Sequence, residues 1–98
     1  MMNPEICAAI RTRSVIKFYY DGGLRTVEPH CHGFSKDGNE LLRGYQTGGY
    51  GQSGKPVSWK LFSVRKISSL QQKEEIFPSN RPDYNPNDRA MKSICCSV

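Results

Sequence analysis

Two tight-turn signals constrain the fold of this chain more than any other feature of its sequence. Asp21-Gly22-Gly23 and Lys36-Asp37-Gly38-Asn39 each combine glycine with a residue that favours a tight turn between strands. Before the first turn, residues 15–20 alternate, so that one face of a strand carries Ile16 and Phe18. Strands joined by such short turns run antiparallel, so the sequence predicts a meander.

The remaining pattern adds further short strands in consecutive order. Pro29 has no amide hydrogen to give to a ladder, so it is expected to close or bulge the second strand. A small barrel would remove the exposed edges of such strands. We therefore predict a mainly β fold, a small SH3-like barrel of about five strands. The segments expected to be extended are 15–20, 24–28, 30–35, 40–46 and 57–64, with a short strand over 67–70.

Short helices are predicted at both ends of the chain. Asn3 is a good N-cap, Pro4 suits the first helical position, and Glu5 complements the helix dipole. Residues 76–87 contain three prolines and are expected to wrap in an extended form. The segment Asn85-Pro86-Asn87-Asp88 repeats the N-cap pattern, which predicts a C-terminal helix with Met91, Ile94 and Cys95 on one face.

Ninety-eight residues predict a single domain over 1–98. Residues 5–70 would form the first helix and the barrel, and residues 71–98 the proline-rich tail and the second helix. Met1-Met2-Asn3-Pro4-Glu5 lacks the basic and apolar regions of a signal peptide. No apolar run approaches the ~20 residues of a membrane span. A cytoplasmic protein without membrane contact is the expectation.

Four cysteines, Cys7, Cys31, Cys95 and Cys96, fit that location as free, partly buried thiols. A bridge between the neighbours Cys95 and Cys96 would be strained. A Cys7–Cys31 pair stays open as the alternative.

The positive charge is unevenly distributed. The net charge is +5, and between Gln46 and Leu70 four basic residues occur with no acidic residue. A local excess of one sign attracts anionic partners, although a solvated lysine-rich face is the simpler explanation. The four residues are Lys55, Lys60, Arg65 and Lys66.

The segment His30-Cys31-His32 raises the question of a metal site. In a regular strand the two histidines point to one side and Cys31 to the other, so at most two residues serve one ion. A zinc site needs three or four ligands, and the chain has no Cys-x-x-Cys pair. No nucleophile elbow, phosphate loop or paired carboxylates are present. We expect neither a metal nor another cofactor, and no enzymatic activity.

The segment Thr47–Pro56 is rich in glycine and carries Tyr50 in its middle. It lacks the spacing of a nucleotide-binding glycine motif, so a flexible connection between strands is the first interpretation. A lid over a binding face is the second.

These motifs together resemble the WYL domain, a small SH3-like barrel of bacterial regulators. Tyr20 matches the tyrosine that ends its first strand, and Arg25-Thr26-Val27-Glu28-Pro29 matches its Arg-x-x-x-Pro motif. Leu42 and Tyr45 match the leucine of the name-giving tripeptide and a later aromatic residue. The segment 60–67 matches the closing motif. The resemblance covers about residues 5–70, and the ending 81–86 is similar to that of stand-alone versions.

This chain departs from the pattern at several positions. Glu40 and Leu41 replace the tryptophan and tyrosine of the tripeptide. In the closing motif, Lys60 and Ser63 replace two arginines and Arg65 replaces an aspartate. Lysine does not reproduce the planar two-pronged grip of arginine on a phosphate. The residues before the barrel do not predict the winged helix of the family's regulators, so we do not expect this chain to read duplex DNA in the usual way.

The resemblance implies a non-catalytic ligand-binding module in transcription regulation. The expected ligand is a nucleotide or single-stranded nucleic acid, because aromatic rings can stack on bases while cations hold phosphates. A protein-protein interaction module without a nucleic-acid ligand is the alternative, and a homodimer stays open. The ligand-binding residues expected are Arg25, Lys60, Arg65, Tyr45, Tyr20 and Phe62.

Overall fold

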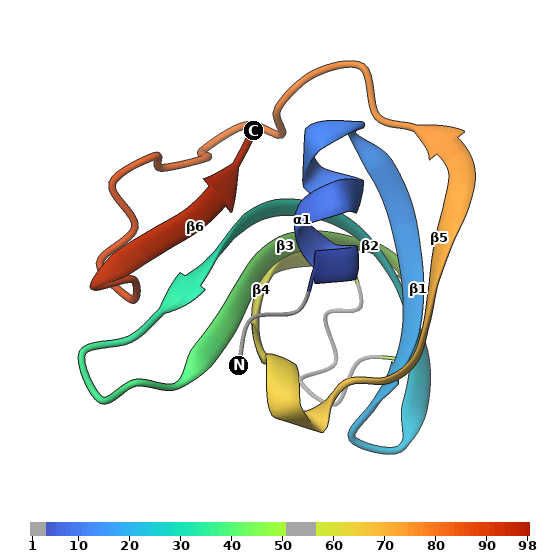
Figure 1. Ribbon diagram of the computed structural model, residues 1–98. Coiled ribbons are helices and arrows are strands. Elements are labelled where there is room, and N and C mark those ends of the chain that lie inside the picture. Colours follow the sequence, from blue (N-terminus) through green and yellow to red (C-terminus); the bar gives the residue numbers. More distant parts are fainter. Residues whose placement is uncertain (1–3, 51–56) are drawn as a thin grey trace.

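A computed structural model describes residues 4–50 and 57–98 of the chain. It contains one α-helix, α1 (Pro4–Arg11), and one 3-10 turn, η1 (Val64–Lys66). The strands are β1 (Ser14–Tyr20), β2 (Gly23–Phe34), β3 (Glu40–Gly49), β4 (Ser58–Ser63), β5 (Ser68–Ile76) and β6 (Ser93–Ser97). The predicted mainly β class and the first helix are therefore confirmed (Figure 1). Asn3, the expected N-cap, and residues 51–56 of the glycine-rich segment lie outside the described residues.

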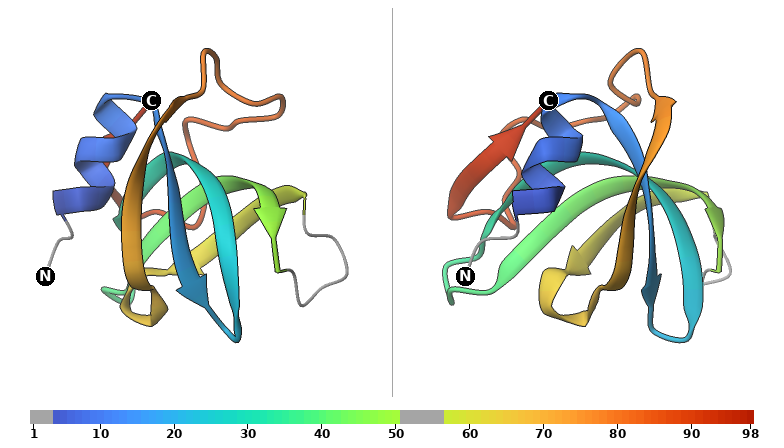
Figure 2. Two further views of the ribbon diagram at one scale, coloured as in Figure 1. Left: turned by 90° about the vertical axis from the view of Figure 1, so that its right-hand side faces the viewer. Right: turned by 45° about the vertical axis from the view of Figure 1, so that its right-hand side comes forward.

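All the strands pair antiparallel in one sheet of order β4-β3-β2-β1-β5, and β6 pairs with the second half of β2. The sheet is strongly curved around the core (Figure 2). The described residues form no ladder between β4 and β5, the two ends of this order. The described sheet thus has six strands, with β4 and β5 as the strands at its ends.

The core lies on the concave, inner face of the sheet. Phe62 packs edge-on against Phe18 and Tyr20, with ring centroids 5.0 Å apart in both pairs. α1 packs its apolar side against β1, β2 and β6 and adds Ile6 and Ile10 to this core. No helix in the described part of the chain has the length and apolarity that a membrane span requires.

One strand, β2, takes the place of the two strands expected around Pro29. The register of β2 against β3 shifts between Pro29 and Cys31, so the proline causes a bulge and the strand continues. Residues 27–33 of β2 are all buried, because the core covers one face and the tail the other. β5 is also longer than the segment predicted for it.

The predicted C-terminal helix is wrong. Residues 93–97 form β6, which pairs with β2 from Phe34 to Cys31. The expected free thiols are also wrong for two of the four cysteines, because Cys7 of α1 and Cys96 of β6 form a disulfide. Cys31 and Cys95 are free, and the Cys7–Cys31 alternative does not occur.

Candidate functional site

Arg25 lies on the inner face of the sheet, although it is charged. It stands opposite the core residue Phe18 in the β1–β2 ladder, and cross-strand partners share a face. Only 5% of Arg25 is exposed. Its guanidinium lies over the rings of Tyr20 and Tyr50, with Cζ 5.5 and 5.4 Å from their centroids. The two rings provide a cation–π environment for a buried charge.

The hydrogen-bond partners of Arg25 are neutral. Nη2 donates to the carbonyl of Tyr20 at 2.9 Å, and Nη1 donates to Gln46 Oε1 at 3.3 Å. Nε is buried and has no hydrogen-bond partner within residues 4–50 and 57–98. Among the described residues no carboxylate forms an ion pair with Arg25. The buried positive charge of Arg25 is therefore not neutralised by a carboxylate in this part of the molecule.

Lys60 lies on the same inner face. In the β3–β4 ladder it is opposite Gly44, between the pairs Gln46–Ser58 and Leu42–Phe62. Leu42 and Phe62 belong to the core, so Lys60 faces inward between them and Gln46. Gln46, which accepts a hydrogen bond from Arg25, lies two residues along β3 from Gly44, the ladder partner of Lys60. The fold thus brings Arg25 and Lys60, 35 positions apart in the sequence, to one face.

Tyr20 connects this region to η1. Its hydroxyl accepts a hydrogen bond from the amide of Ser63 at 2.9 Å. Lys66 lies over the same ring, with Nζ 5.3 Å from the centroid, and forms an ion pair with Asp21 at 3.1 Å. Arg65 precedes Lys66 in η1 and is exposed. We call Arg25, Lys60, Lys66, Tyr20 and Gln46 the inner cationic cluster.

Two predicted site residues lie elsewhere. Phe62 is a core residue with 1% exposure. It packs against the Tyr20 ring of the cluster and has no exposed surface for a ligand. Tyr45 is opposite Trp59 and Glu28 and so lies on the convex, outer face. There its ring carries the guanidinium of Arg81, with Cζ 4.7 Å from the centroid.

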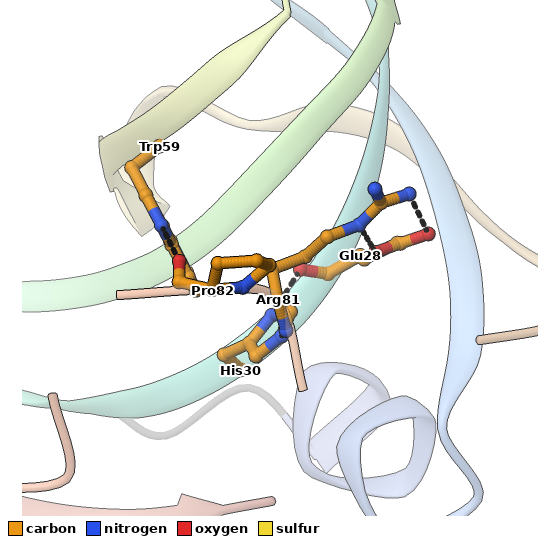
Figure 3. Close-up of polar contacts among 5 residues, drawn as sticks. All are labelled: Glu28, His30, Trp59, Arg81 and Pro82. Atoms are coloured by element: carbon orange, nitrogen blue, oxygen red, sulfur yellow. Dashed lines mark hydrogen bonds and ion pairs between the residues drawn. The ribbon is translucent and has the colours of Figure 1, made fainter. Parts of the chain in front are cut away.

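On the outer face, the tail is held by a set of polar contacts (Figure 3). Arg81 forms a two-pronged ion pair with Glu28, with Nε and Nη2 2.6 and 3.0 Å from the carboxylate oxygens. This hydrogen bonding raises the pKa of Arg81. The indole of Trp59 donates to the carbonyl of Pro82 at 2.9 Å. The predicted extended tail therefore docks against the sheet in the manner of a bound peptide.

His30 fixes the tail at a second point. Its Nδ1 lies 2.8 Å from the carbonyl of Glu28 and its Nε2 accepts from the amide of Arg81 at 3.2 Å. Burial lowers the pKa of His30, which agrees with a neutral ring that donates at Nδ1 and accepts at Nε2. His30 is therefore a structural residue with both nitrogens occupied.

Two of the cavities beside the tail share Trp59 and Asp83. One, of about 340 Å³, is lined by Arg43, Trp59, Asp83, Tyr84, Asn85, Asp88 and Arg89. The other, of about 290 Å³, is lined by Tyr45, Val57, Ser58, Trp59, Pro82 and Asp83. Arg43 binds Asp88 with Nε 2.7 Å from Oδ2, and this hydrogen bond lowers the pKa of the Asp88 carboxyl. The charges that line the larger cavity are thus largely balanced within the protein.

The expectation that His30 and His32 share one side of a strand is wrong. The bulge at Pro29–Cys31 turns His30 to the outer face, beside Trp59 and Phe77, while His32 contacts Cys7 and Cys96. Cys31 between them is buried, and burial raises the pKa of its thiol to about 11. A thiol of this kind is a poor nucleophile at neutral pH.

Several residues of these surfaces carried little signal in the sequence. Gln46 belongs to the inner cationic cluster, and Tyr50 lies beside the cluster over Arg25, only because the sheet is curved. Trp59 is predicted only as part of a strand. Trp59 is the one tryptophan of the chain, which was the available clue to the outer face.

The chain was compared with protein-family models, with curated proteins and with solved structures, and none of the three comparisons found a match.

Proposed function

We propose that this chain is a non-catalytic binding module that takes an anionic ligand, a nucleotide or single-stranded nucleic acid, at the inner cationic cluster. The observation that carries the proposal is the guanidinium of Arg25, which is buried and has only neutral hydrogen-bond partners in the described part of the chain. A buried charge without a counter-ion is costly, and a bound anion would neutralise it.

The neighbours of Arg25 suit a phosphate-bearing ligand with a planar base. Lys60 faces the same side of the sheet, and Lys66 lies over the Tyr20 ring. Tyr50 covers Arg25 and is 47% exposed, so a movement of this one ring opens the guanidinium and offers a stacking surface. In this proposal Arg25 and Lys60 pair with phosphate while the exposed Arg65 adds long-range attraction.

A regulatory role of the WYL type, in a bacterial cytoplasm, rests on the sequence resemblance alone. Among the residues that match the WYL pattern, Arg25 is the most important for the proposed binding of an anion. Lys60 and Arg65 occupy two positions of the closing motif, with the substitutions described above. The proposed ligand class follows from the chemistry of these side chains.

The first prediction concerns binding of a short fluorescent oligothymidylate. Wild-type protein is expected to bind it, with affinity falling roughly 20-fold between 50 and 200 mM salt if about three phosphates are contacted. Arg25→Gln and Lys60→Gln are each expected to weaken binding by about ten- to a hundred-fold, because each removes a charge-assisted hydrogen bond. Fluorescence anisotropy measures all three affinities.

Lys36→Gln is the matched control, since it removes the same charge from the exposed β2–β3 turn at the other end of β2. It is expected to change affinity less than two-fold. Lys60 is half-buried, so its variant tests the proposal even where Arg25→Gln does not fold. Absence of binding by wild-type protein at low salt, or equal losses in Lys36→Gln and Lys60→Gln, would refute the proposal.

A protein-interaction module is the second candidate, favoured by the way in which the tail docks on the outer face. Trp59 binds a peptide carbonyl next to an arginine held by a carboxylate, which is a mode of recognition that a partner's segment can also use. In Arg81→Ala the segment 78–86 would lose its ion pair with Glu28. We expect that variant to bind a synthetic peptide of residues 78–86, and wild-type protein to bind it at least ten-fold more weakly.

Fluorescence of the single tryptophan, Trp59, reports this binding directly. The control is the same peptide with alanine in place of its arginine. An unchanged emission spectrum of Arg81→Ala at millimolar peptide, or equal responses to the two peptides, would eliminate the second candidate.

A further inference from the structure

The disulfide between Cys7 and Cys96 has a histidine beside it. His32 Nδ1 lies 3.2 Å from the sulfur of Cys7 and 3.7 Å from the sulfur of Cys96. His32 is fully buried and Cys7 is 4% exposed. The three potential ligand atoms all lie within 4.8 Å of one another. They come from α1, β2 and β6, so the fold gathers two cysteines and one histidine from three elements.

The contact of His32 Nε2 shows which nitrogen of the ring carries the hydrogen. Nε2 lies 2.6 Å from Glu40 Oε2, and an ionised carboxylate only accepts, so Nε2 carries the hydrogen. In the neutral imidazole Nδ1 then presents a lone pair to the two sulfurs. A disulfide has no hydrogen to donate to this lone pair, which is therefore left without a donor among its described contacts. A buried acceptor without a donor is costly.

This arrangement has the features of a metal site. A histidine that ligates through one nitrogen usually donates its other N–H to a carboxylate, which orients the ring and raises its basicity. Zinc bonds of about 2.3 Å to sulfur and about 2.0 Å to nitrogen, at tetrahedral angles, place S and N roughly 3.5 Å apart. The two observed S–N distances lie on either side of that value.

We propose that the reduced protein binds one zinc ion through Cys7 Sγ, Cys96 Sγ and His32 Nδ1, and that the disulfide is the oxidised, metal-free form of the same site. A dithiol reductant would supply two electrons and two protons, giving two protein thiols and its own disulfide. Zinc would then bind both sulfurs as thiolates and release those two protons. A water molecule would complete the tetrahedral coordination.

The test is titration of the dithiol-reduced protein, after removal of the reductant under anaerobic conditions, with Co²⁺ as a spectroscopic substitute for zinc. We expect one equivalent of Co²⁺ to produce thiolate-to-metal charge-transfer bands and tetrahedral d–d bands, and Zn²⁺ to remove both. The oxidised protein is expected to show neither. Cys7→Ser and Cys96→Ser should weaken binding at least a hundred-fold, whereas Cys31→Ser and Cys95→Ser, which change cysteines outside the cluster, should leave it unchanged.

His32→Asn and His30→Asn separate the two buried histidines. Only His32→Asn should weaken Co²⁺ binding, since His30 already has partners at both nitrogens. Circular dichroism follows folding in the same samples, and if the reduced protein unfolds, one equivalent of Zn²⁺ should restore the spectrum. Reduced wild-type protein without the bands, or bands that persist in both Cys7→Ser and Cys96→Ser, would overturn the proposal.

Discussion

Replacing Cys96 with serine is expected to lower the free energy of unfolding by about 4 kcal/mol under oxidising, metal-free conditions. The disulfide joins residues 89 positions apart and so restricts nearly the whole unfolded chain. It also ties α1 to β6, two elements at opposite ends of the sequence. For a domain of this size, the midpoint of thermal unfolding should fall by roughly 20 °C. Denaturant titration followed by circular dichroism measures the difference.

Cys95→Ser is the control for this prediction, because Cys95 is the adjacent residue and forms no disulfide. It should change the free energy of unfolding by less than about 1 kcal/mol. Reduction of the wild-type protein in the presence of a chelator should reproduce the loss seen in Cys96→Ser. Equal stabilities of oxidised wild-type protein and Cys96→Ser would contradict the assigned pairing.

Phe62→Ala is expected to cost about 3–5 kcal/mol of unfolding free energy. The ring is 1% exposed and packs edge-on against Phe18 and Tyr20, with interplanar angles of 88° and 85°. Its removal leaves a cavity between β1 and β4 that the surrounding strands cannot close. Chemical denaturation measures this loss of unfolding free energy. If the Phe62→Ala protein still folds, Arg25 and Lys60 should keep their positions.

Leu61→Ala is the matched control for Phe62, since Leu61 is the preceding residue of β4 and is 41% exposed. Successive residues of a strand point to opposite faces, so its truncation should cost less than about 1 kcal/mol. A larger cost for Leu61→Ala than for Phe62→Ala would show that the inner and outer faces of β4 have been interchanged.

Local patterns predicted those parts of the fold in which neighbouring residues decide the structure. Pro4 and Glu5 mark the start of α1, and the alternation of Ile16 and Phe18 predicts β1. The turn before Glu40 is set by Gly38, which adopts φ +81°, a backbone conformation that glycine takes without strain. Each of these features is determined by neighbouring residues and does not depend on contacts with the rest of the chain.

Pairing between strands far apart in the sequence determines the parts of the fold that the local patterns did not predict. Residues 93–97 have apolar spacing that suits a helix, but the free edge of β2 and the bond to Cys7 favour a strand. Pro29 was expected to end or bulge a strand, and only the pairing of β2 with β3 settles that it bulges. The bulge in turn separates His30 from His32, so one local irregularity changed the predicted relation of two histidines.

The candidate site was partly accessible from the sequence. The motifs predict Arg25 and Lys60 as ligand-binding residues, and the register brings both to the inner face. The cluster of Cys7, His32 and Cys96 was not accessible, because its ligands are far apart in sequence and follow none of the usual spacings. Only the packing of α1 and β6 against β2 brings them together.

The most direct test of the inner cationic cluster is the side-chain NMR signal of Arg25. In ¹⁵N-labelled protein, titration with a thymidine oligonucleotide is expected to shift the Nε–H resonance of Arg25 and to saturate it at one equivalent. The indole N–H resonance of Trp59, on the outer face, should stay unchanged. A titration that leaves Arg25 unmoved, or that shifts Trp59 alone, would contradict the proposed site.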